Sequence, residues 1–451
     1  SLTEEDESAD EPANSSSADG LSYTNNSKNV KGYIARDGKM YLRNKGFWDT
    51  MPADLSSISK PVAIDRIVFS IWPPAASASR GLLAREFIGY LGNLIGRDRV
   101  HELRVWLDAA AVSPDMQRMP ATIPVTQIEA AVVAAGGHYP GGEVKKFHGA
   151  LNFLPDKHFV ILAGLSGSGK TQLAIRYAHA VHGVTGKDAP DPFLFVCPVR
   201  PEWTDPTGLT GYDDVLSKRY LVPQFLEAVL LATAHRYSPV FVVLDEMNLA
   251  RVEYYFSDVL SAIETQKELR LHFSGVPMEG STGTTVPSAI RLPSNLYIIG
   301  TINVDETTNP VSDKVLDRAM VIDMSAIELA GFLTGLEARE LGLKEAREAC
   351  ESHLLAAHNL MSAHGLGFGY RVAEEAVRYH AFAAQQLQAQ PSETTDDLMV
   401  QKVLVKLRGS EKQRPLLTGL QKALVGLPRS QAFLAHLVSD LDEFGSFQAS
   451  R

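Results

Sequence analysis

Residues 164–171 have the residue types and spacing of a phosphate-binding loop. They read Gly-Leu-Ser-Gly-Ser-Gly-Lys-Thr, which matches GxxxxGK followed by Ser or Thr, between an apolar run and a helical pattern. Glycines let the backbone N–H groups of such a loop turn inward around phosphate oxygens, and the following helix adds its positive end. We therefore expect Lys170 to bridge the β- and γ-phosphates of GTP or ATP and Thr171 to hold Mg²⁺. The candidate nucleotide-binding residues are Gly164, Ser166, Gly167, Ser168, Gly169, Lys170, Thr171 and Gln172.

Two acidic residues end a later apolar run. Residues 240–244 are Val-Phe-Val-Val-Leu, and Asp245 and Glu246 follow directly. An apolar strand that ends in two acids, downstream of a phosphate-binding loop, is typical of a nucleoside triphosphatase. We expect Asp245 to bind Mg²⁺ through water and Glu246 to act as the general base toward the attacking water.

A polar residue also ends the apolar run 296–300. Asn303 follows this run after Thr-Ile. A polar side chain there can reach between the loop and the acidic pair and orient the water, so Asn303 is a catalytic candidate.

Two arginines are further catalytic candidates. Arg318 ends the segment 313–318, and we expect it to project into the nucleotide of a neighbouring subunit and neutralise charge in the transition state. The alternative for Arg318 is a surface ion pair. Arg371 lies at the start of an expected helix, 372–385, where it could contact the nucleotide from a lid. Its alternative is a helix-start residue paired with an acidic side chain one turn later, Glu374 or Glu375.

The elements that must position these residues follow from the apolar pattern. The runs 159–163, 193–196, 240–244 and 296–300 predict strands buried on both faces of a parallel sheet. Amphipathic patterns alternate with them, so the fold class is α/β, with a parallel sheet flanked by helices. The sequence predicts a helical lead-in over 125–154 and a helical C-terminal region.

The chain divides into four predicted parts. Residues 1–29 are acidic and poor in apolar residues, which predicts a disordered linker. Residues 30–120 predict a small mixed α+β domain, with an Asp-Gly hairpin over 33–42, a strand over 66–72 and a helix over 81–109. Residues 121–325 form the expected nucleotide-binding core and 326–451 the helical lid and C-terminal region.

Basic and aromatic residues alternate over residues 28–48, within the N-terminal part. Such a surface could contact the phosphates and bases of DNA. The alternative is a small sheet whose lysines are simply solvated.

Composition limits the other possibilities. The net charge of −10 excludes a uniformly basic nucleic-acid-binding protein. The two cysteines lie far apart, so we expect no disulfide, no zinc site and a cytoplasmic location. No apolar run is long enough to span a membrane.

Taken in order, these motifs resemble the McrB family of AAA+ proteins, over about residues 125–410. The segments that carry the resemblance are the loop 164–171, the segment 198–212, the extended acidic motif 245–250, and residues 300–308, 314–319 and 401–409. This resemblance implies a P-loop AAA+ core with a helical lid, assembled as a hexameric ring with a nucleotide at each interface.

The resemblance also implies a function and partners. McrB-like proteins are GTP-hydrolysing motors of restriction systems that act against phage DNA, and they work with McrC, a nuclease subunit that stimulates hydrolysis. No Asn-Lys-x-Asp motif for guanine is present, so the choice between GTP and ATP stays open. The alternative is a protein remodeller similar to the MoxR family, driven by ATP and without nucleic acid.

Overall fold

The computed structural model describes residues 20–24, 31–35, 40–42, 118–186, 189–304 and 308–449. Near the N-terminus, β1 (Gly20–Thr24), β2 (Lys31–Ala35) and β3 (Met40–Leu42) form an antiparallel sheet in the order β1-β2-β3. The predicted hairpin is confirmed, because β2 pairs with β3 and Tyr33 lies opposite Tyr41. Strand β1 falls within the segment predicted as a linker. The predicted strand 66–72, the predicted helix 81–109 and the side chains of the basic and aromatic segment 28–48 lie outside the described residues.

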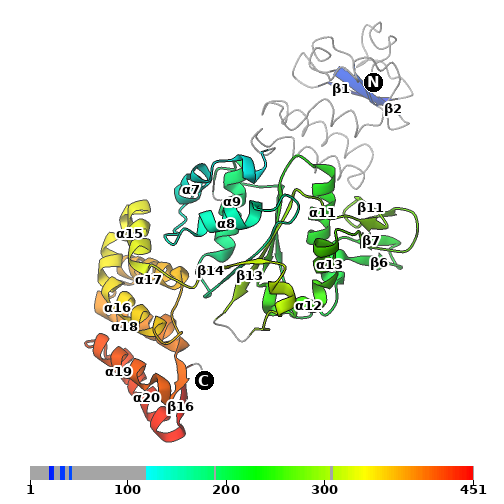
Figure 1. The fold of residues 1–451 in the computed structure, drawn as a ribbon. Coiled ribbons are helices and arrows are strands. Elements are labelled where there is room, and N and C mark those ends of the chain that lie inside the picture. Colours follow the sequence, from blue (N-terminus) through cyan, green and yellow to red (C-terminus); the bar gives the residue numbers. More distant parts are fainter. Residues whose placement is uncertain are drawn as a thin grey trace.

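A five-stranded parallel sheet forms the centre of the described structure (Figure 1). Four of its strands are those that the four apolar runs predict, and the fifth, at residues 320–323, was not predicted. Its strands lie in the order β14-β4-β13-β8-β5, and every neighbouring pair is parallel. The strands are β4 (Phe159–Gly164), β5 (Leu194–Pro198), β8 (Val240–Asp245), β13 (Leu296–Asn303) and β14 (Met320–Asp323).

Helices cover both faces of this sheet, which is why its strands are apolar throughout. On β8, Phe241 and Val243 pack into the core on one face, and Val242 and Leu244 pack into the core on the other. The first face carries α7 (Val125–Ala134), α8 (Glu143–Asn152) and α9 (Lys170–His182). The second face carries α11 (Gln224–Ala234), α12 (Val252–Tyr255) and α13 (Ser257–Thr265).

Three short antiparallel strand pairs and two single-turn helices lie between these elements. The strand pairs are β6 (Tyr212–Asp214) with β7 (Arg219–Leu221), β9 (Leu269–Arg270) with β12 (Ala289–Ile290), and β10 (Met278–Glu279) with β11 (Thr285–Val286). The short helices are α10 (Thr207–Thr210) and α14 (Asp313–Leu316). The sequence predicted none of these strand pairs, because strands of two or three residues are too short to show alternation.

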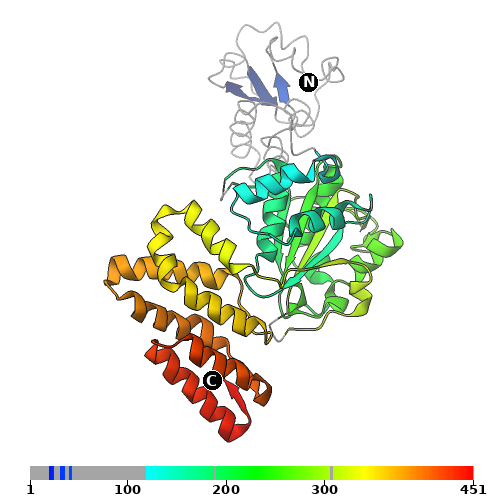
Figure 2. The same ribbon diagram turned by 60° about the vertical axis from the view of Figure 1, so that its left-hand side comes forward.

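The C-terminal part is a helical layer with its own apolar core, between Leu329 and Phe447 (Figure 2). Its helices are α15 (Leu329–Arg339), α16 (Lys344–Ser362), α17 (Tyr370–Phe382), α18 (Pro391–Leu398), α19 (Arg414–Ala423) and α20 (Pro428–Phe444). Two π-helical turns, Ala383–Leu387 and Met399–Val403, continue α17 and α18. One strand pair, β15 (Arg408–Ser410) with β16 (Ser446–Gln448), interrupts an otherwise helical region.

Short 3₁₀ turns complete the described structure, at Pro120–Thr122, Met247–Leu249, Leu341–Leu343, Leu404–Lys406 and Glu411–Gln413. Among the described helices, none has the length and apolar character needed to cross a membrane. Cys197 and Cys350 are both buried and free.

One buried histidine makes folding sensitive to pH. His235, at the end of α11, is 8% exposed and packs edge-on against Phe193. Burial lowers the pKa of His235 to about 4. The unfolded chain therefore binds this proton more readily than the folded chain, and the free energy of unfolding falls as the pH drops from 6.5 toward 4.

We expect His235→Gln to reduce this pH dependence. The loss of unfolding free energy between pH 7 and pH 5 should shrink by about 1–2 kcal/mol, because glutamine does not titrate. Urea unfolding at several pH values measures this slope. His436→Gln, at a side chain that is 75% exposed, is the control. An unchanged slope in His235→Gln would show that His235 does not contribute.

Candidate functional site

The glycine-rich loop joins the end of β4 to the start of α9. Gly167 and Gly169 have φ angles of 78° and 92°, a region that favours glycine, and Ser168 N–H donates to Leu165 O at 3.1 Å. Lys170 is only 6% exposed, and its ammonium donates to the carbonyl oxygens of Gly164 at 3.0 Å and Leu165 at 2.7 Å. The sequence-predicted loop thus places a buried cation at the N-terminus of α9.

Thr171, the residue after Lys170, contacts the acidic end of β8 through its hydroxyl. Thr171 Oγ1 donates to Asp245 Oδ1 at 2.6 Å. The same carboxylate oxygen accepts a hydrogen bond from Thr301 Oγ1 of β13 at 2.9 Å. Within the described residues no three His, Cys, Asp or Glu side chains form a metal-binding group. A hydroxyl and one carboxylate beside the glycine-rich loop are instead the kind of oxygen donors that suit Mg²⁺, which takes most of its ligands from water and phosphate.

Glu246 lies at a turn directly after β8, beside the end of β13. It has a φ angle of 54°, which is uncommon for a residue with a side chain. Its N–H donates to Thr301 Oγ1 at 2.9 Å, and its Oε1 accepts a hydrogen bond from Asn303 Nδ2 at 3.4 Å. The structure therefore brings Asn303 to the acidic pair, one of the two motifs between which the sequence analysis placed it.

An amide network that the sequence analysis did not identify supports this turn. Asn248 is 5% exposed, and its Nδ2 donates to Thr308 Oγ1 at 2.6 Å and to the carbonyl oxygen of Asn303 at 3.4 Å. Asn309 Nδ2 donates to Leu249 O at 3.1 Å. The clustered Asn and Thr residues were visible in the sequence, but their contacts bridge segments about sixty residues apart along the chain.

Arg318 makes an ion pair within its own chain. Its Nε donates to Glu264 Oε2 at 2.8 Å, a second guanidinium nitrogen contacts the same carboxylate, and Nη1 donates to Lys314 O at 2.6 Å. The structure therefore places Arg318 on the side of α13, whose last turn carries Glu264. This is the ion pair that the sequence analysis gave as the alternative for Arg318.

Arg371 contacts the glycine-rich loop through its backbone. Helix α17 begins two residues earlier than predicted, and Arg371 N–H donates to Gly167 O at 3.4 Å. The alternative partners are engaged elsewhere, because Glu374 pairs with Arg378 and Glu375 with Lys402. Arg371 makes no ion pair among the described residues.

Gly369, just before α17, approaches the loop even more closely. A Cβ at this position would lie 2.4 Å from the carbonyl carbon of Gly167 and 2.6 Å from Ser166 O. The C-terminal helical layer therefore contacts the loop through backbone atoms, which only glycine allows at this distance.

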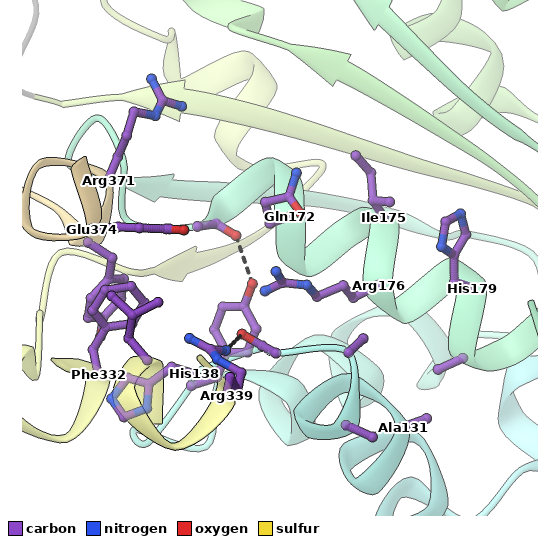
Figure 3. Close-up of a pocket in the computed structure, with 18 of the residues that line it drawn as sticks. Ala131, His138, Gln172, Ile175, Arg176, His179, Phe332, Arg339, Arg371 and Glu374 are labelled. Atoms are coloured by element: carbon purple, nitrogen blue, oxygen red, sulfur yellow. Dashed lines mark hydrogen bonds between the residues drawn. The ribbon is translucent and has the colours of Figure 1, made fainter. Parts of the chain in front are cut away.

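A cavity of about 870 Å³ opens beside the loop (Figure 3). Gln172, Ile175, Arg176 and His179 of α9 line one wall, and residues of α7, α15 and α17 line the others. The polar and charged side chains in the lining are His138, Tyr139, Ser168, Gln172, Arg176, His179, Thr185, Arg339, Glu340, Tyr370, Arg371, Glu374 and Arg378. The lining includes more basic than acidic side chains.

A cluster of aromatic side chains lines the cavity where the loop after α7 meets the helical layer. His138, from the loop after α7, packs against Phe332 of α15 and Tyr370 of α17, with ring centroids 6.0 and 5.5 Å apart. Tyr139 OH donates to Gly169 O at 3.0 Å, and burial raises the pKa of Tyr139 to about 12, so the phenol keeps its proton. The sequence analysis missed these residues, because no local motif surrounds His138 and Tyr139.

Comparisons with known proteins cover part of the chain. Residues 327–447 match the family model of a domain of unknown function (DUF8727). This match coincides with the C-terminal helical layer and includes Tyr370 and Arg371, but not the glycine-rich loop. A search of the curated proteins found no match.

We expect Gly369→Ala to separate α17 from the glycine-rich loop. Gly369 has φ −83° and ψ 178°, which alanine also adopts, so the strain would come from the close contacts with Gly167 and Ser166. The melting temperature should fall by several degrees, which corresponds to about 1–3 kcal/mol. Gly335→Ala within α15 is the matched control, because nothing lies within 4 Å of its Cβ position. Equal melting temperatures for the two variants would contradict this contact.

Proposed function

We propose that this chain is a Mg²⁺-dependent nucleoside triphosphatase. The observation that carries the proposal is the convergence of the Thr171 and Thr301 hydroxyls on one carboxylate oxygen of Asp245, next to Lys170 and the glycine-rich loop. Helix α9 and strands β8 and β13 supply these groups. Such a combination of a phosphate-binding loop, an acidic pair and a polar strand end suits hydrolysis of a phosphoanhydride.

The loop and its lysine would bind the phosphates. Backbone N–H groups of the loop and the positive end of α9 favour an anion there, and Lys170 adds a buried cation. Thr171 and Asp245 would hold Mg²⁺, which when bound neutralises negative charge on the phosphates. Arg371, at the contact between α17 and the loop, adds a further cation from the helical layer.

Glu246 would act on the attacking water. Its carboxylate can accept the proton of that water as the bond to phosphorus forms, and the Asn303 amide bonded to Oε1 limits how the carboxylate can turn. The nucleoside would occupy the neighbouring cavity, whose volume of about 870 Å³ is in the range of small-ligand sites. Nothing in its lining distinguishes guanine from adenine, so the substrate is GTP or ATP.

At the level of the assembly, we propose an AAA+ motor similar to the McrB family. Support comes from the order of the motifs along the sequence and from the contact of a helical lid with the loop. In this proposal subunits form a hexameric ring that is required for hydrolysis, with Arg318 supplied to the neighbour's nucleotide. A McrC-like nuclease would be the partner, and DNA the substrate of the motor, in restriction of phage DNA.

We expect Glu246→Gln to abolish hydrolysis and keep nucleotide binding. Loss of the general base should lower kcat by about 10²- to 10⁴-fold. Lys170→Ala should instead weaken binding, because it removes the buried cation of the loop. Release of phosphate from GTP and from ATP, together with binding of fluorescent analogues, separates the two effects.

Glu348→Gln is the control for this pair, because that glutamate lies on the surface of α16 and is 55% exposed. It should leave both quantities unchanged. Hydrolysis that persists in Glu246→Gln and in Lys170→Ala would show that the reaction, if any, takes place elsewhere.

If Arg318 acts on a neighbouring subunit, two inactive variants should complement each other. Arg318→Ala keeps an intact loop and acidic pair, and Glu246→Gln keeps the arginine. We expect each alone to be inactive and their mixture to recover part of the rate, because mixed interfaces combine an intact site with an intact arginine. No recovery on mixing, with both variants folded, would favour a structural role in the Glu264 ion pair.

Stimulation of the wild-type rate by duplex DNA would favour the McrB-like motor over a MoxR-like remodeller.

A further inference from the structure

We propose that Thr301 is a positioning residue that sets the geometry of Asp245 and Glu246 together. This inference rests on the proposed nucleoside triphosphatase activity and assigns a role to a residue that none of the sequence motifs singled out. Thr301 is 1% exposed and lies on β13, two residues before Asn303.

The Thr301 hydroxyl makes two hydrogen bonds of opposite direction. Oγ1 donates to Asp245 Oδ1 at 2.9 Å and accepts from Glu246 N–H at 2.9 Å. A hydroxyl has one donor, so that donor is committed to the carboxylate proposed to hold Mg²⁺. One buried oxygen atom thus connects that carboxylate to the backbone of the proposed general base.

The register of the sheet places Thr301 at this point. Strand β13 pairs in parallel with β8, and the last register pair is Gly300 with Leu244. The next residues on the two strands are Thr301 and Asp245, so their side chains are neighbours on one face of the sheet. Asn303 follows on the same face and reaches Glu246 Oε1. Thr301 and Asn303 therefore approach Glu246 from one strand. Thr301 contacts the backbone N–H of Glu246, and Asn303 contacts its carboxylate.

The bond to the Glu246 N–H acts on a disfavoured backbone conformation. Glu246 has a φ angle of 54°, in the left-handed backbone region that residues with a side chain rarely adopt. Such a conformation persists when surrounding contacts hold it, and the Thr301 hydroxyl supplies one of these contacts. Without it, the turn that directs the Glu246 carboxylate would lose a restraint.

The bond to Asp245 acts on the carboxylate orientation. Thr171 and Thr301 donate to the same oxygen, Oδ1, from two sides. This pair of donors restricts rotation of the carboxylate, and Oδ2 has no hydrogen-bond partner among the described residues. Loss of the Thr301 donor would loosen the carboxylate, which should weaken Mg²⁺ binding as well as catalysis.

The test compares Thr301→Val with Thr301→Ser in the full chain. Valine keeps the shape and removes the hydroxyl, whereas serine keeps the hydroxyl. We expect Thr301→Val to lower kcat by about tenfold or more, since a buried hydrogen bond to a charged group is lost. KM for the nucleotide should change little. Thr301→Ser should recover most of the wild-type rate.

A second readout does not depend on turnover. Titration of Mg²⁺ into the chain bound to a fluorescent GTP or ATP analogue reports the Mg²⁺ requirement of the complex. In Thr301→Val the half-saturating Mg²⁺ concentration should rise several-fold, while binding of the analogue without Mg²⁺ stays the same. Thr233→Val is the matched control, because its hydroxyl donates only to Val229 O within α11.

The possible outcomes separate the two proposals. If the wild-type chain hydrolyses nucleotide and Thr301→Val has the same kcat and Mg²⁺ requirement, Thr301 has no positioning role and the proposed function stands. If valine and serine variants are impaired equally, the hydroxyl is not the cause and the proposal also fails. A wild-type chain that neither binds nor hydrolyses nucleotide overturns both proposals.

Discussion

Parallel pairing of β13 with both β4 and β8 is the constraint on which the candidate site depends. Strand β4 leads into the glycine-rich loop, and β8 ends in Asp245. With β13 between them, the ends of all three strands meet at one edge of the sheet, and polar side chains of β13 reach the acidic pair. Any other position for β13 would leave Asp245 and Glu246 without the hydroxyl and amide donors of Thr301 and Asn303.

Burial around this edge determines what the polar groups can do. Lys170, Thr301 and Asn303 are each less than one-tenth exposed, so their interactions are screened less than those of surface groups. The donors of Thr301 and Asn303 are also directed before any ligand binds, since Asp245 and Glu246 already hold them in hydrogen bonds. A site organised in this way needs little rearrangement to stabilise charge that develops during a reaction.

The helical layer completes the site from the other side. Its contact with the glycine-rich loop is made of backbone atoms at Gly369 and Gly167, and the aromatic cluster around His138 joins it to the loop after α7. The cavity therefore lies between two layers that have separate apolar cores. A change in the angle between these layers would alter the cavity and the position of Arg371 together. Such an arrangement suits a coupling between what is bound in the cavity and movement of the helical layer.

The sequence by itself determined the features that depend on neighbouring residues along the chain. The loop 164–171, the acidic pair after β8, the buried parallel strands and the Asp-Gly hairpin each have a local pattern, because glycine positions, apolar runs and turn residues act over a few residues. The tertiary structure alone decided the strand order, the two bonds of Thr301, the walls of the cavity and the pairing of Arg318 with Glu264. These depend on contacts between residues far apart in sequence, and no local pattern specifies which distant segment will lie beside a given strand or helix.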